Sequence, residues 1–102
     1  MTVAHIEIPE AAIGAVCRRN GIRKLALFGS VLTDRFSDSS DIDVLVEFQP
    51  QERVGFFRMA DIEDELSRLL GYRKVDLRTP MDLSRYFREE VIRNAQVVYD
   101  GS

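Results

Sequence analysis

The chain has 102 residues, of which 45% are hydrophobic and 30% are charged, which is typical of one globular domain spanning residues 1–102. Apolar runs stay short of the roughly 20 residues that cross a bilayer, and the N-terminus lacks the basic-then-apolar order of a signal peptide. A net charge of −3 excludes a strong basic field for nucleic acid, and a single cysteine, Cys17, excludes an internal disulfide. We therefore expect a cytoplasmic protein with no membrane partner and with nucleic acid disfavoured.

The first third of the chain predicts a helix followed by a short strand. Residues 9–20 begin with a proline, which suits a first helical turn, and Gly21 follows as a stop. Cys17 lies on the apolar stripe of this helix and is interpreted as a core residue. Residues 24–28 predict an apolar strand, and residues 30–35 a turn or two of helix before a polar loop.

The middle of the chain predicts a second strand, a long helix and a third strand. Residues 42–48 alternate between apolar and polar side chains, the pattern of a strand with one buried face. Residues 54–70 carry apolar side chains at helical spacing, and Gly71 is a plausible stop. Residues 74–77 predict the third strand.

The last quarter of the chain opens on a helix start signal. Thr79 suits an N-cap, proline follows in the first turn, and Asp82 completes a capping box. One helix is expected from there, with an apolar face formed by Leu83, Phe87 and Val91. Residues 96–99 predict either a fourth strand or an extended tail. Helices interleaved with strands predict an α+β fold with a mixed sheet and helices packed against it.

Two aspartates mark the second predicted strand: Asp41 comes directly before it and Asp43 lies within it. Side chains alternate between strand faces, so one face is expected to be buried and carries Ile42, Val44, Val46 and Phe48. The other face carries Asp41, Asp43, Leu45 and Glu47, and the Cα atoms of the two aspartates lie roughly 6–7 Å apart. Neighbouring carboxylates raise each other's pKa, and a divalent cation between them reverses that effect. The pair suggests a magnesium site, and a plain solvated sheet face remains the alternative.

The first and third predicted strands each carry one further candidate feature of the site. Gly29 and Ser30 follow the first strand, and ten residues separate Ser30 from Asp41. Glycine admits a close backbone approach and a serine hydroxyl can bond a phosphate oxygen; an ordinary turn capped by Ser30 is the alternative. Asp76 interrupts the third strand. If that strand lies beside the second, Asp76 reaches the same metal site; otherwise it is a solvent-facing residue.

The segments LFGS, SDIDVLVEF and KVDLRTP, in this order and spacing, resemble the minimal nucleotidyltransferases of the DNA polymerase β superfamily, of the HEPN/MNT toxin–antitoxin type. The resemblance covers about residues 22–99. It implies that Gly29 and Ser30 bind nucleotide phosphates, and that three aspartates are catalytic and hold two Mg²⁺ ions: Asp41, Asp43 and Asp76. The run GSVLTDR departs from the basic and small residues that many relatives carry after Gly-Ser.

The same resemblance implies an activity and a partner. Many small members act as antitoxins of a HEPN toxin, and some of these transfer AMP from ATP to a hydroxyl acceptor, a tyrosine of the toxin. The sequence therefore predicts a Mg²⁺-dependent nucleotidyltransferase that uses ATP and has a HEPN-type protein as its partner. The alternative is a binding module with weak or no catalysis, which neutralises its partner by capping it.

Overall fold

The computed structural model describes residues 1–101 of the chain. The elements in chain order are β1 (Thr2–Val3), β2 (Ile6–Glu7), α1 (Glu10–Arg19), β3 (Ile22–Phe28), the 3₁₀ turn η1 (Gly29–Leu32), β4 (Ile42–Phe48), α2 (Phe56–Leu69), β5 (Val75–Arg78), the 3₁₀ turn η2 (Pro80–Asp82), α3 (Arg88–Asn94) and β6 (Gln96–Asp100). Within residues 1–101, none of the helices has the length and apolar content that crossing a bilayer requires.

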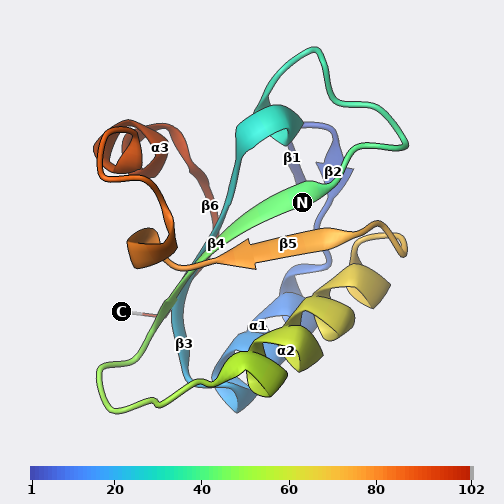
Figure 1. The fold of residues 1–102 in the computed structure, drawn as a ribbon. Helices are drawn as coiled ribbons and strands as arrows, with labels where there is room; N and C mark the ends of the chain where they lie inside the picture. Colours follow the sequence, from blue (N-terminus) through green and yellow to red (C-terminus); the bar gives the residue numbers. More distant parts are fainter. Residues whose placement is uncertain (102) are drawn as a thin grey trace.

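Four strands form one sheet in the order β5-β4-β3-β6, and β1 pairs with β2 in a separate hairpin (Figure 1). The β4–β5 pair is parallel, whereas β3 is antiparallel to both β4 and β6. The sheet is therefore mixed, and the α+β fold predicted from the sequence is confirmed. The segment 96–100 is a strand, which resolves the choice left open for it.

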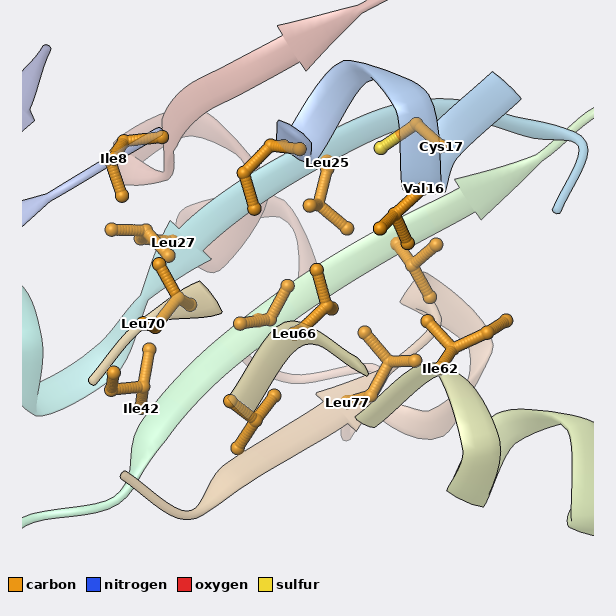
Figure 2. Close-up of a cluster of buried hydrophobic side chains, with 14 of the residues drawn as sticks. Ile8, Val16, Cys17, Leu25, Leu27, Ile42, Ile62, Leu66, Leu70 and Leu77 are labelled. Carbon is orange, nitrogen blue, oxygen red and sulfur yellow. The ribbon is translucent and has the colours of Figure 1, made fainter. Parts of the chain in front are cut away.

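One face of the sheet forms the main core, and α1 and α2 cover it (Figure 1). Of the four β4 residues predicted to share a buried face, Ile42, Val44 and Val46 are at most 1% exposed, and Phe48 is partly buried against the same core. Ile62 and Leu66 of α2 pack against them, as Figure 2 shows for Ile42, Ile62 and Leu66 among others. Burial raises the pKa of the Cys17 thiol on α1 to about 12, as expected of a core cysteine.

The opposite face of the sheet carries a second, smaller apolar cluster. Ala26, Phe28 and Leu45 are buried there, and partly buried residues of the C-terminal segment pack against them: Leu83, Val91 and Ala95. Leu45 lies on the same strand face as Asp43, so this face is apolar toward α3 and acidic at the start of β4.

The single helix expected after Thr79 is wrong. Its start signal is real, because the Thr79 N–H donates to Asp82 Oδ2 at 3.0 Å, but the helix stops after η2 and α3 begins only at Arg88. The Arg88 guanidinium explains the interruption. Its Nε donates to the Pro80 carbonyl at 2.7 Å and its Nη2 to the Leu83 carbonyl at 3.0 Å. The side chain thus takes over carbonyls that a continuous helix would bond to its own backbone.

The loop between η1 and β4, residues 33–41, is held by contacts from two other parts of the chain. Phe36 stacks on His5 of the β1–β2 turn, with ring centroids 6.4 Å apart, and the Arg73 guanidinium lies 4.9 Å from the Phe36 ring. Arg73 also donates to the Ser37 carbonyl at 3.2 Å and to Asp38 Oδ1 at 3.1 Å. These contacts of His5 and Arg73 hold the loop that separates the Gly-Ser turn from Asp41 and Asp43.

Strand β5 is an edge strand that α2 holds from outside the sheet. The Leu77 N–H donates to Glu63 Oε2 at 2.8 Å, so a side chain of α2 bonds the backbone of β5. At the other end, the Ile42 N–H donates to the Lys74 carbonyl at 2.8 Å. The first bond holds β5 against α2 and the second holds it in register with β4, and together they position Asp76.

Candidate active site

Asp43 occupies the centre of the acidic site because of strand register. It lies opposite Phe28 in the antiparallel β3–β4 pair and opposite Asp76 in the parallel β4–β5 pair. Directly paired residues in a sheet point to the same face, so Asp43 and Asp76 project side by side. The sequence left open whether the Asp76 strand neighbours the Asp43 strand, and the structure makes it the next strand (Figure 1).

Gly29 brings the backbone of the Gly-Ser turn directly against the Asp43 carboxylate. Its φ of +77° lies in the left-handed region that side chains disfavour, and a Cβ added there would stand 2.4 Å from Asp43 Oδ2. A close approach is thus the reason for glycine at this position. The GSVLTDR run departs from charged and small residues at Val31 because that side chain is fully buried in the main core. Arg35, in the same run, is exposed.

The electrostatics of the site are those of a crowded acidic pair. Burial is the largest cause that raises the pKa of Asp43, followed by the charge of Asp76; Asp41 adds to the rise and Arg78 opposes it. The raised pKa means that the folded protein disfavours the Asp43 negative charge in the absence of a cation. A cation bound between the carboxylates would relieve that repulsion.

Two basic side chains contact the carboxylates on either side of Asp43, namely those of Asp76 and Asp41. Arg78 donates to Asp76 Oδ2 from Nη2 at 3.1 Å and from Nε at 3.3 Å. Lys74 Nζ lies 3.8 Å from Asp41 Oδ2, and Asp41 is exposed just before β4 begins. Within residues 1–101, no three acidic, histidine or cysteine side chains converge on one point in a way that would hold a metal ion as they stand.

The site residues nevertheless fit Mg²⁺ by the chemistry of their donors. Magnesium takes hard oxygen ligands, often one or two carboxylates completed by substrate phosphates and water. Asp43 and Asp76 offer such a pair on neighbouring strands, and Asp41 stands two residues before Asp43 on the same side of the strand. Arg78 would have to release Asp76 Oδ2 for both oxygens of that carboxylate to face a metal ion.

Sequence reasoning placed Leu45 on this face but missed Arg78 as part of it. Arg78 stands two residues after Asp76 and pairs with Leu45 across β4–β5, so both belong to the face that carries the acidic pair. The period of two that placed Asp43 and Leu45 on β4 would have found Arg78 had it been extended along β5. The two-stranded β1–β2 hairpin gave no signal of comparable strength, since each strand has only two residues.

Comparison with known proteins agrees with the motifs and the fold. The family model "Polymerase beta, Nucleotidyltransferase" matches residues 11–102. The protein adenylyltransferase MntA of Thermococcus cleftensis is 35% identical over 81 residues, which are 79% of this chain and 77% of that protein.

Solved structures give the same answer. A protein assigned as a minimal nucleotidyltransferase superposes with a TM-score of 0.67 and 31% identity, covering 84% of this chain and 85% of its own. A toxin–antitoxin crystal structure with AMP-PNP has the same fold, with a TM-score of 0.70 at 20% identity, over 91% of this chain and 74% of that one. The chain therefore belongs to the polymerase beta nucleotidyltransferase family and, within it, to the minimal nucleotidyltransferases related to MntA.

Proposed function

We propose that this protein is a magnesium-dependent adenylyltransferase that moves AMP from ATP to a hydroxyl group of a partner protein. The observation that carries the proposal is the position of Asp43, between the Gly29 backbone and Asp76. That arrangement places the backbone of the Gly-Ser turn, which can bind a phosphate, beside a pair of carboxylates that can bind a metal ion. The similarity to an MntA protein adenylyltransferase supports a protein as the acceptor.

Each site residue has a role in this proposal. Asp41, Asp43 and Asp76 hold the metal ions, and Gly29 and Ser30 bind the β- and γ-phosphates. When bound, Mg²⁺ would supply charge stabilisation at the α-phosphate and at the leaving oxygen. The acceptor oxygen forms a bond to the α-phosphorus, the bond from that phosphorus to the β-phosphate oxygen breaks, and pyrophosphate leaves. The hydroxyl proton passes to the Asp76 carboxylate and then to water.

A toxin is the partner class that the related structures support. The fold matches the crystal structure of the toxin–antitoxin pair MntA–HepT with a TM-score of 0.61 at 19% identity. We propose that the acceptor is a tyrosine of a HEPN-type toxin, as the motifs first implied. The net charge of −3 fits a protein acceptor better than a nucleic acid, whose phosphates are normally gripped by basic side chains.

A second candidate function is capping of a partner without transfer. Phe56 and Phe57 favour it, because they are 81% and 83% exposed at the start of α2. Adjacent exposed aromatic side chains of this kind are characteristic of protein interfaces. Contact with Arg78 also leaves Asp76 unready for a metal ion in the free chain.

Intact-mass measurement on the partner separates the two functions. The chain, ATP and Mg²⁺ are incubated with the product of the adjacent gene, and the partner gains the mass of one or more AMP groups. Asp76→Ala abolishes the gain, whereas Asp64→Asn, which removes an exposed carboxylate paired with Arg68 on α2, leaves it unchanged. If the partner is neutralised by both variants and never gains mass, the capping function is correct and the transfer function is wrong.

A further inference from the structure

A cavity of about 550 Å³ lies between the Gly-Ser turn and the C-terminal segment. Most of its lining is apolar: Phe28 and Leu32 on one side, and Leu83, Phe87 and Val91 on the other. Polar side chains complete the lining, among them Glu90 and Asn94 of α3. Small-molecule sites combine these features, namely a volume of roughly 300–1,000 Å³, apolar walls and a few polar groups.

Gly29 belongs both to this cavity and to the acidic site. It lines the cavity, and its backbone stands against the Asp43 carboxylate. A molecule bound at the Gly-Ser turn therefore has the carboxylates on one side and the apolar cavity on the other. None of the roles assigned to the aspartates, Gly29 or Ser30 uses the cavity.

We propose that this cavity binds the adenine base of the nucleotide whose phosphates lie at Gly29 and Ser30, with α3 reading the base. The inference rests on the proposed function and adds to it the residues that select the nucleotide. Phe87 is 61% exposed and lines the cavity, so its ring can stack on a flat base. The rest of the lining holds few polar groups that would compete with the Phe87 ring for the base.

Glu90 and Asn94 supply the selectivity. They stand four residues apart on α3 and hence on the same side of the helix, and both line the cavity. An asparagine amide offers a donor and an acceptor that match the N7 and N6 positions of adenine. A glutamate carboxylate accepts from the exocyclic amino group but repels the carbonyl oxygen that uracil carries in its place. The pair therefore favours adenine over uracil.

The order of the strands assigns the cavity to the nucleotide and not to the acceptor side chain. Asp76 on β5 and Phe28 on β3 flank Asp43 from opposite sides. In an in-line displacement the acceptor enters opposite the leaving pyrophosphate. With pyrophosphate held at Gly29 on the β3 side and the acceptor proton taken by Asp76 on the β5 side, the cavity falls on the side of the nucleotide.

Calorimetric titration with Mg²⁺ present tests this with three probes: ATP, UTP and inorganic triphosphate. The unmodified chain binds ATP more tightly than either of the others. Phe87→Ala weakens ATP binding about tenfold, as loss of base stacking predicts, and leaves triphosphate binding unchanged. Phe57→Ala is the matched control, since it removes an exposed phenylalanine that does not line the cavity, and it changes neither affinity. Asn94→Ala brings the affinities for ATP and UTP together.

The outcomes separate the inference from the proposed function. If the unmodified chain binds ATP and triphosphate equally well, or if Phe87→Ala weakens both alike, the cavity does not hold the base, and the adenylyltransferase function still stands. If ATP is selected over UTP but Asn94→Ala and Glu90→Gln leave the selection intact, α3 does not read the base. If neither ATP nor triphosphate binds, the proposed function itself fails, and the inference fails with it.

Discussion

The two faces of the sheet are built on the same strands and follow opposite rules. On one face, β4 contributes Ile42, Val44 and Val46, all fully buried beneath α1 and α2. On the other, the same strand contributes Asp43, which is half-buried, and Leu45, which is buried against residues of α3 and the segment before it. The first face supplies stability through apolar burial. The second tolerates a charge that the folded state disfavours, which is typical of a face kept for binding and chemistry.

The largest effect that sharpens this contrast is expected from Asp43→Asn. Removing a metal-binding charge lowers the transfer rate by about a thousandfold. The melting temperature holds or rises, because the pKa of Asp43 is raised by burial and by Asp76, so its charge opposes folding at neutral pH. Transfer is measured by mass spectrometry and stability by thermal unfolding. A large loss of stability would contradict this prediction and would mean that the Asp43 carboxylate stabilises the fold.

On the core face, Leu66→Ala is expected to show the reverse pattern. Leu66 is fully buried on α2, and truncating a buried leucine costs about 2–5 kcal/mol of unfolding free energy. Transfer per folded molecule stays close to that of the unmodified chain, because no side chain of the acidic site is removed. Denaturant titration and active-fraction measurements check this. Unchanged stability would show that the packing of α2 on β4 is not what holds the fold.

A comparison of Gly29→Ala with Gly71→Ala isolates the contact between the Gly29 backbone and the Asp43 carboxylate. Both glycines have positive φ, +77° and +83°, so each substitution costs about 1–2 kcal/mol of backbone strain. Only at Gly29 would the new Cβ meet Asp43; at Gly71 nothing lies within 4 Å. Gly29→Ala therefore loses more stability than Gly71→Ala, because the Asp43 carboxylate must also shift, and only Gly29→Ala loses affinity for ATP with Mg²⁺. Equal affinities would place the phosphates elsewhere.

The smallest effect concerns Arg78, which shares the acidic face. Arg78→Gln frees the Asp76 carboxylate, so Mn²⁺ without nucleotide binds a few-fold more tightly, and the metal-free chain loses at most about 1 kcal/mol of stability. Arg68→Gln is the control, because it makes the same charge change in an exposed pair with Asp64. Weaker Mn²⁺ binding in Arg78→Gln alone would instead make Arg78 a residue that orients Asp76 for the metal.

The core face was predictable because its signal is local and periodic. The alternation in residues 42–48 gave both the strand and its buried side, and Gly29 was marked by the turn that precedes the aspartates. The adjacency of Asp76 was predicted only conditionally, because strand order depends on pairing between distant segments. The backbone bond from Ile42 to Lys74 and the side-chain bond from Glu63 to the Leu77 amide hold β5 in place, and no local pattern encodes either.

The opposite face was predicted less well because it depends on side chains that reach across the chain. The start signal at Thr79 was read correctly, yet the helix breaks where Arg88 takes the Pro80 and Leu83 carbonyls. Propensity within the segment favours helix there, and tertiary bonds override it. The same reasoning applies to Phe36, whose loop is held by His5 and Arg73 from distant parts of the sequence.

The bond between Glu63 and the Leu77 amide also bears on self-association. An edge strand with open backbone groups invites a strand of another molecule to pair with it. On β5 the Glu63 carboxylate already accepts the N–H that faces away from β4, next to Asp76 in the chain. A strand added there would lengthen the sheet and also crowd the acidic pair. Because the Glu63 side chain occupies this N–H, β5 offers one backbone group fewer to a pairing strand at the edge beside the acidic pair.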